Sequence, residues 1–137
     1  MAQKLNATLT LSSTAGVEGA SNNMDIDLSV SDTLTIAAPL QGLSTVIADN
    51  TGANTIIKPA GTAVAYLYVK NTGTTNGATA SDKLVDVEET GDAAFARLGP
   101  DEFMFVPFNH HAGNVGIQLQ VTTDHSVQME YAWFTKG

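Results

Sequence analysis

The chain is 137 residues long and acidic, with six Lys and Arg against 14 Asp and Glu and a formal net charge of −8. This length suits one domain with its own hydrophobic core, while the scattered basic residues predict neither nucleic-acid binding nor binding to an anionic membrane. The absence of Cys excludes thiol chemistry, disulfides and cysteine zinc sites.

The N-terminal residues 1–6 alternate polar and apolar side chains, so we expect no secretory signal. No apolar run is long enough to predict a membrane-spanning helix, and the protein is expected to begin in a cytoplasm. The charged fraction, 15%, is lower than the about 25% of an ordinary soluble domain. Small neutral polar residues replace the charges, which suits packing against other subunits, although a β-rich surface explains the composition equally well.

Alternation with a period of two begins near the N-terminus and predicts half-buried strands. Four segments in the first part of the chain show it: residues 4–12, 24–36, 43–48 and 55–58. A Gly-, Ser- and Asn-rich loop at 14–23 separates the first two. Asp32 interrupts the second segment and predicts a bend or bulge, and Pro39 is expected to end that element. The composition of residues 49–54 predicts a hairpin loop.

The remainder of the chain has the same character. The expected strands are residues 63–69, 83–88, 93–98, 103–108, 115–122 and 127–133. Residues 63–69 are apolar on both faces, which predicts a central position in a sheet. The turn at 89–92 is expected to join two short strands. Residues 103–108 are also apolar on both faces and predict either a central strand or an interface strand.

No segment shows a convincing helical stripe, and many short strands separated by Gly, Asn and Pro turns indicate a sandwich or barrel. Without crossover helices, the pairing is expected to be antiparallel. We therefore predict an all-β, antiparallel β-sandwich over residues 1–137, jelly-roll-like or immunoglobulin-like, as a single domain. Residues 1–23 are expected to form a partly extended N-terminal arm that orders on docking.

Three histidines are the first candidates for chemistry, because imidazoles bind zinc and copper. His110 and His111 are adjacent, and His125 offers a third ring. Adjacent residues on an extended chain point to opposite faces, so this pair is poorly placed to hold one ion together. A simple turn is the favoured interpretation. Val106 and Pro107 before the same loop are similar to the second motif of the cupin family, but no histidine precedes His110 to supply the first motif, which excludes that family.

Carboxylates are the second candidates. Asp25 with Asp27, and Asp86 with Glu88, would each share a strand face, as an acid/base pair or cation site requires. An acidic cluster also covers six residues that lack the fixed spacing of a calcium loop: Asp86, Glu88, Glu89, Asp92, Asp101 and Glu102. Solvated acidic side chains on the polar faces of strands are the favoured interpretation. We predict no catalytic, cofactor-binding or metal-binding residue, no cofactor, and no enzymatic activity.

Aromatic residues offer a carbohydrate platform as an alternative: Tyr66, Tyr68, Phe103, Phe105, Phe108, Tyr131, Trp133 and Phe134. Most of them lie where core positions are expected, so packing is favoured. No Ser lies in a Gly-x-Ser-x-Gly elbow, and no Gly-rich phosphate loop leads into a helix.

Two segments resemble small virion proteins of tailed phages, especially marine and cyanobacterial ones. They are residues 66–72, Tyr-Leu-Tyr-Val-Lys-Asn-Thr, and residues 95–108, Phe-Ala-Arg-Leu-Gly-Pro-Asp-Glu-Phe-Met-Phe-Val-Pro-Phe, with the closing strands up to Trp133. The resemblance implies a β-sandwich subunit that decorates or cements a capsid in the virion as a symmetric homo-oligomer, with a trimer favoured. Its implied partners are the major capsid protein or other virion subunits, without nucleic acid or membrane.

Other functions remain open at the level of sequence. A tail-tube, head–tail connector or baseplate component satisfies the same constraints, and a carbohydrate-binding β-sandwich module is the alternative from a different class. The decoration role is preferred because the chain is short and lacks the long insertion expected of a tube subunit. An acidic surface would repel DNA in either virion role.

Overall fold

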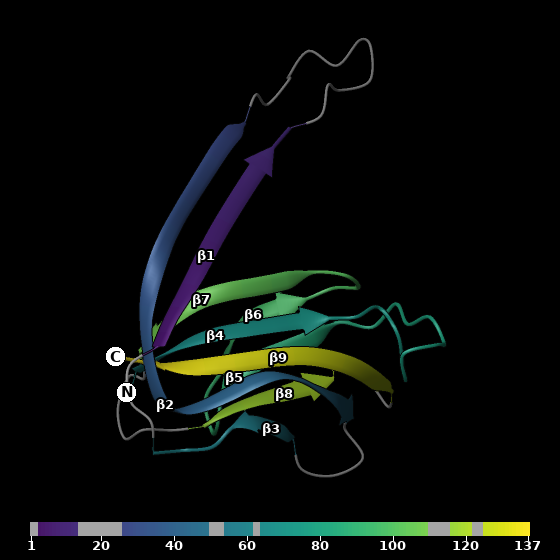
Figure 1. Ribbon diagram of the computed structural model, residues 1–137. Coiled ribbons are helices and arrows are strands. Elements are labelled where there is room, and N and C mark those ends of the chain that lie inside the picture. Colours follow the sequence, from purple (N-terminus) through teal and green to yellow (C-terminus); the bar gives the residue numbers. More distant parts are fainter. Residues whose placement is uncertain (1–2, 14–25, 50–53, 62–63, 110–115, 122–124) are drawn as a thin grey trace.

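The computed structural model describes residues 3–13, 26–49, 54–61, 64–109, 116–121 and 125–137. The described residues form nine strands and no helix, and every strand pair is antiparallel. Figure 1 shows how the strands are arranged. The strands are β1 (Gln3–Ser12), β2 (Asp27–Asp49), β3 (Thr55–Lys58), β4 (Val64–Asn71), β5 (Val85–Glu89), β6 (Ala94–Leu98), β7 (Phe103–Asn109), β8 (Ile117–Val121) and β9 (Ser126–Lys136). The predicted all-β, antiparallel architecture is confirmed.

The strands lie in two sheets, with orders β1-β2-β9-β4-β7 and β3-β8-β5-β6. Strands β2 to β9 pair in a nested way, so that β2 pairs with β9, β3 with β8, β4 with β7 and β5 with β6. This is the pattern of one long antiparallel hairpin rolled into two facing sheets, which is the jelly roll. The strand order therefore selects the jelly roll over the immunoglobulin-like alternative.

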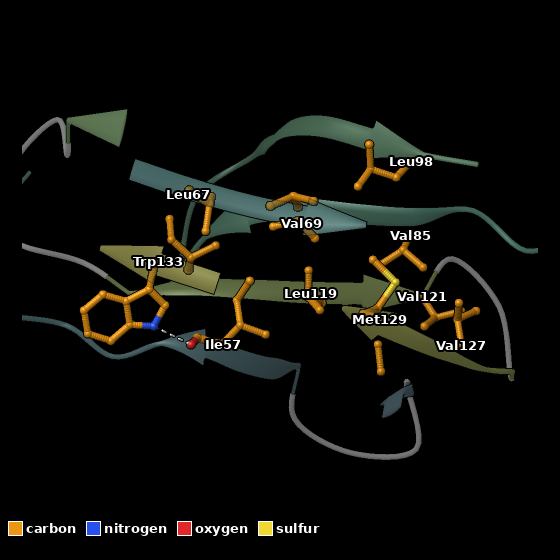
Figure 2. Packing of buried hydrophobic residues seen from close by; sticks show 13 residues of the cluster. Ile57, Leu67, Val69, Val85, Leu98, Leu119, Val121, Val127, Met129 and Trp133 are labelled. Atoms are coloured by element: carbon orange, nitrogen blue, oxygen red, sulfur yellow. Dashed lines mark hydrogen bonds between the residues drawn. The ribbon is translucent and has the colours of Figure 1, made fainter. Parts of the chain in front are cut away.

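The core lies between the two sheets and is built from the inward side chains of alternating strands. Leu67 and Val69 of β4 face Val85 and Leu119 of the second sheet, and all four are fully buried (Figure 2). The Trp133 indole N–H donates to the Ile57 carbonyl oxygen at 3.1 Å, which ties β9 to β3 across the layers. The buried aromatic thus satisfies its polar atom without interrupting the apolar core.

Strand β2 belongs to two parts of the molecule. Its first part, up to Ile36, pairs with β1, and its second part, from Ile36 to Asp49, pairs with β9. The β1–β2 ribbon, which we define as β1 with residues 27–36 of β2, projects away from the sandwich, as Figure 1 shows. The sandwich body is the remainder of the two sheets.

Two sequence predictions on β2 are wrong. For the bend or bulge predicted at Asp32, the bulge is wrong, because Asp32 pairs in regular register with Ala7. Pro39 does not end the strand. The register shifts instead between Ala37 and Leu40 and between Gln41 and Ser44. Pro39 is tolerated because it lies in this irregularity, where a residue need not donate a backbone hydrogen bond to the neighbouring strand.

Two further predictions concern how strands pair. Residues 49–54 do not close a hairpin, because β2 and β3 lie in different sheets; Ala48 and Ile57 both point into the core between them. The turn at 89–92 does close the predicted hairpin of β5 and β6, with Asp92 N–H donating to the Glu89 carbonyl at 3.0 Å. Strand β4 lies between β9 and β7, as predicted, whereas β7 is an edge strand and not a central one.

Candidate functional site

An aliphatic stripe covers one face of the β1–β2 ribbon. It consists of Leu5, Ala7, Leu9, Leu11, Leu28, Val30 and Leu34. The register sets Leu5 opposite Leu34, Leu9 opposite Val30 and Leu11 opposite Leu28, so the side chains form cross-strand pairs on one side. Val30 is 53% exposed and Leu9 46% exposed. An apolar ladder of this kind is normally covered, because scattered single apolar residues, and not contiguous ones, are usual on a surface.

The opposite face of the ribbon is polar and satisfied by its own cross-strand bonds. Lys4 Nζ donates to Thr35 Oγ1 at 2.8 Å, and Thr33 Oγ1 donates to Asn6 Oδ1 at 3.0 Å. Thr8 with Ser31, and Thr10 with Ser29, continue the same face. The ribbon is therefore amphipathic, with one polar face and one mainly apolar face.

Within the part of the chain that the structure describes, β1 pairs only with β2, and residues 27–35 of β2 pair only with β1. A two-stranded ribbon alone is marginally stable at best in water. The aliphatic stripe and the unpaired strand edges are therefore left uncovered by the described residues.

An aromatic patch lies on the outer face of the five-stranded sheet. It consists of Tyr66, Tyr68, Phe103, Phe105 and Phe134. These side chains alternate with the inward Leu67, Val69 and Trp133, and Phe103 is 63% exposed. The Tyr66 and Phe105 rings stack with centroids 6.1 Å apart and planes 11° from parallel, and Lys136 Nζ lies 5.1 Å from the Tyr66 centroid.

The patch corrects the prediction that most aromatic residues belong to the core. That prediction is right for Trp133, which is buried, and for Phe108 and Tyr131, which pack against the core. It is wrong for the five members of the aromatic patch. The sequence did contain a signal for this patch, because β4 and β7 have apolar residues on both faces. Only one face of a sheet in a two-layer sandwich packs on the core, so the other apolar face remains outside.

The stripe and the patch lie on the same side of the five-stranded sheet. Ile36, at the base of the ribbon, is opposite Lys136 of β9, and Leu40 is opposite Phe134. Opposed residues of a ladder point to the same face. Ile36 is buried at this junction, while Leu40 is 41% exposed. One apolar surface therefore runs from the sandwich body onto the ribbon, which rises from the end of the sheet where β9 finishes (Figure 1).

Tyr68 is the member of the patch whose hydroxyl group forms a hydrogen bond. Its hydroxyl donates to Glu130 Oε1 at 2.7 Å. Burial, followed by the hydrogen bond and the negative charge of Glu130, raises the pKa of Tyr68 to about 12. The phenol therefore stays neutral and supplies no base or nucleophile at neutral pH.

The outer face of the four-stranded sheet carries charged and amide side chains, together with the exposed Ile56 of β3. Asp86 accepts two bonds from Arg97, at 2.6 Å from Nε and 2.9 Å from Nη2. Glu88 Oε1 accepts from Asn54 at 2.7 Å and from Gln118 at 2.6 Å. Asp86 and Glu88 share a face, as predicted from their spacing, and each carboxylate is held by partners of its own.

The other predicted site residues do not form a site among the described residues. Glu102 Oε2 accepts from the Gly99 N–H, and Asp92 Oδ1 accepts from the Ala93 N–H, so both carboxylates shape turns. No three His, Asp or Glu side chains of the described ranges gather closely enough to hold a metal ion. His110, His111 and Asp25 lie outside the described residues, while Asp27 and His125 are exposed.

Lys58 is the buried cationic residue that sequence reasoning missed. Its side chain lies 5.7 Å from the centroid of the Trp133 ring, and Nζ donates to the Pro59 carbonyl at 3.4 Å. Burial lowers the pKa of this amine. Amines with a lowered pKa serve as nucleophiles in open sites, but Lys58, at the end of β3, is fully buried beside the Trp133 ring and packs as part of the fold.

None of the described residues forms a helix long and apolar enough to cross a membrane. Comparison with protein-family models found no match, and comparison with curated proteins found no significant relative. The exposed apolar surface formed by the aliphatic stripe and the aromatic patch is the candidate functional site of the described residues.

Proposed function

We propose that this protein is a virion structural subunit that decorates a capsid and stabilises it through protein–protein contacts. The observation that carries the proposal is the aliphatic stripe on a ribbon that projects from a complete sandwich. The body has its own buried core, so the ribbon is not needed to form it. An exposed apolar surface of this size on a projecting element serves association.

The charges of the molecule support the same class of function. Seven of the 14 acidic residues and two of the six basic ones lie in residues 82–102, far from the ribbon in sequence. The carboxylates of Asp86 and Glu88 in this region are held in structural bonds. An acidic body repels DNA, while the stripe face of the ribbon, on which Asp32 is the one charged residue, is free to contact protein. Jelly rolls include viral capsid domains, which is an analogy of fold and not of site.

Mass action gives the mechanism. A protein that binds the assembled shell and not its dissociated subunits stabilises the shell by the free energy of binding. Because the contact is apolar and involves few charges, it remains strong at the ionic strength of a cell. No chemical step is required of any side chain.

The test adds the purified chain to empty shells of the virus that encodes it, made without this protein. We expect saturable occupancy and a higher dissociation temperature of the shell. Deleting residues 1–23 removes β1, and we expect the truncated chain to keep a folded body and to lose occupancy. Undiminished occupancy by the truncated chain would contradict a role for the ribbon, and absence of binding by the full chain would contradict the decoration role.

A carbohydrate-binding module is the second candidate, and the exposed stacking of Tyr66 and Phe105 is the observation that favours it. Sugar binding also needs polar groups that fix orientation, and the hydroxyl of Tyr68 is already bonded to Glu130. Thermal stabilisation of the monomer by a glycan, lost in Tyr66→Ala, would favour this candidate. A tail-tube, connector or baseplate role would use the same surface and is separated from decoration by where the protein lies in the particle.

A further inference from the structure

We infer that the aliphatic stripe of one copy of this chain packs on the aromatic patch of a second copy. This inference deepens the proposed assembly function by naming the contact between subunits. It rests on that function only in part, since the contact between copies forms whether or not a shell is present.

The first argument is the match between two uncovered surfaces. The stripe is a row of leucine and valine side chains, and the patch is a broad aromatic surface with Phe103 and Phe105 exposed at the edge strand β7. Aliphatic side chains against aromatic faces give dense apolar packing, and aromatic residues are enriched at the centres of interfaces. The ribbon projects away from the body (Figure 1), and Phe103 and Phe105 of the patch are 63% and 42% exposed, so the stripe is available to the patch of a neighbour.

The second argument is charge. A chain with a net charge of −8 repels its own copies over most of its surface. The two surfaces avoid this repulsion. On the stripe face of the ribbon the charged residue is Asp32, and on the face of the sheet that carries the patch the register places Lys70, Glu130 and Lys136. The ribbon therefore carries a small negative excess and the patch a small positive one, which makes them complementary.

The third argument is the position of Asp32. It is the one charged residue within the apolar row, opposite Ala7, and its Oδ1 accepts the Thr33 N–H at 2.7 Å. Ala7 and Asp32 both have short side chains, and a shallow, open hollow at this level of the ribbon is lined by Asn6, Ala7, Thr8, Ser31, Asp32 and Thr33. Lys136 stands over the Tyr66 ring in the patch. A carboxylate in the stripe and an ammonium in the patch fix the register of the contact.

The contact joins two different surfaces, so it is heterologous. Each copy offers one stripe and one patch, and a closed ring satisfies all of them without leaving an open end. We expect a discrete closed oligomer, with three copies as the ring that the assembly role favours. A closed ring also covers the ribbon of every copy. This packing would stabilise the ribbon, because a two-stranded element alone is marginally stable at best in water.

The experiment compares three double variants by light scattering after size exclusion. Leu9→Asp with Val30→Asp places two charges in the stripe, and Phe103→Asp with Phe105→Asp places two in the patch. Thr8→Asp with Ser31→Asp adds the same charges to the polar face of the same ribbon strands and is the matched control. We expect the stripe and patch variants to be folded monomers by circular dichroism, and the control to keep the wild-type mass.

Mixing the two monomeric variants gives the most specific readout. The stripe variant retains an intact patch and the patch variant an intact stripe, so an equimolar mixture is expected to form a dimer. A mixture that stays monomeric would overturn the inference. A contact between two ribbons would leave the patch variant, whose stripe is intact, at the wild-type mass, and that result would overturn the inference as well. In a second series, Asp32→Lys is expected to weaken the oligomer about tenfold or more, with recovery on adding Lys136→Asp.

A wild-type chain that stays monomeric at high concentration would also overturn the contact between copies. The shell experiment then decides the proposed function separately. If monomeric wild type binds shells and the stripe variant does not, the ribbon contacts the shell protein, and the decoration role stands without the self-contact. If an oligomer forms as inferred but no shell binding occurs, the contact stands and the decoration role fails.

Discussion

The strands of the sandwich body and those of the β1–β2 ribbon show the same alternation of apolar and polar residues. The apolar side chains are buried in the body and exposed in the ribbon. In β8, Ile117, Leu119 and Val121 alternate with polar residues, and their side chains are 0–2% exposed. In the ribbon, Leu9 and Val30 alternate with polar residues in the same way and are about half exposed. A period of two therefore specifies a strand with one apolar face, but it does not specify what covers that face.

This difference shows that the body buries its own apolar side chains, whereas the described residues leave those of the ribbon uncovered. The body closes because its two sheets supply apolar faces to each other, and its polar atoms find partners within the fold, such as the Trp133 indole with Ile57. The ribbon has no second layer among the described residues. Substitutions of the same type in the two regions should consequently have very different effects on the free energy of unfolding.

The largest contrast is expected from truncating one leucine in each region. Leu119→Ala removes a fully buried side chain and should lower the free energy of unfolding by about 2–5 kcal/mol through lost burial and a cavity. Leu9→Ala should lower it by less than about 0.5 kcal/mol in the monomer, because little burial is lost. Urea unfolding followed by fluorescence of Trp133, at a protein concentration where the chain is monomeric, measures both. Equal losses would contradict the division into body and ribbon.

An asparagine pair gives the next contrast. Asn71 is fully buried, its Nδ2 donates to the carbonyls of Lys83 and Leu98, and its Oδ1 accepts from Gly73 N–H. Asn71→Ala leaves buried backbone groups unpaired and should cost about 1–3 kcal/mol. Asn6 in the ribbon bonds only to Thr33 at an exposed position, so Asn6→Ala should be nearly neutral. The same unfolding measurement applies, and a neutral Asn71→Ala would contradict the role assigned to this side chain.

Two glycines provide a test of packing. A Cβ at Gly116 would lie 2.7 Å from the Lys58 carbonyl oxygen, whereas a Cβ at Gly42, in the bend of β2, would meet nothing within 4 Å. Gly116→Ala should cost about 1–3 kcal/mol because β8 and the end of β3 must separate. Gly42→Ala should leave the stability unchanged or raise it slightly. Thermal unfolding compares the two variants, and tolerance of Gly116→Ala would show that the two strands are farther apart than described.

The smallest effect is expected at Tyr68. Because the fold raises the pKa of this phenol to about 12, its neutral form contributes stability that is fully present below the unfolded pKa of about 10 and is lost as the pH rises toward 12. Titration of phenolate absorbance should show one tyrosine ionising late. Tyr68→Phe should remove that step and cost about 0.5–1.5 kcal/mol at neutral pH through the lost hydrogen bond. Persistence of the late step in the variant would assign it to another tyrosine.

Much of the fold could be predicted from sequence because local alternation and turn residues determine strands. The hairpin of β5 and β6 was accessible from Gly91 and its neighbours, whose turn is closed by the bond from Asp92 to Glu89. The pairing of β2 with β9 was not accessible, since residues so far apart in sequence carry no local signal of their contact. The same limit explains the wrong hairpin at 49–54, because β2 and β3 on either side of it lie in different sheets.

The candidate site shows the limit more sharply. The apolar residues of the stripe were identified as one face of two strands, yet only the register of β1 with β2 makes them a single row. The aromatic residues of β4 were assigned to the core because Tyr66 and Tyr68 flank Leu67 and Val69, and parity alone does not say which pair faces inward. The decoration role stays a prediction, carried by the exposed surface and the resemblance in sequence.

Amide hydrogen exchange at two protein concentrations tests the central claim most directly. The claim is that the body is stable by itself, whereas the ribbon is held by a second copy. At a concentration that favours the oligomer, amides of residues 117–121 and of residues 27–35 should both be protected. On dilution to monomer, protection of 117–121 should persist and that of 27–35 should be lost. Protection of the ribbon that does not change on dilution would show that the ribbon is stable alone, and it would contradict the account.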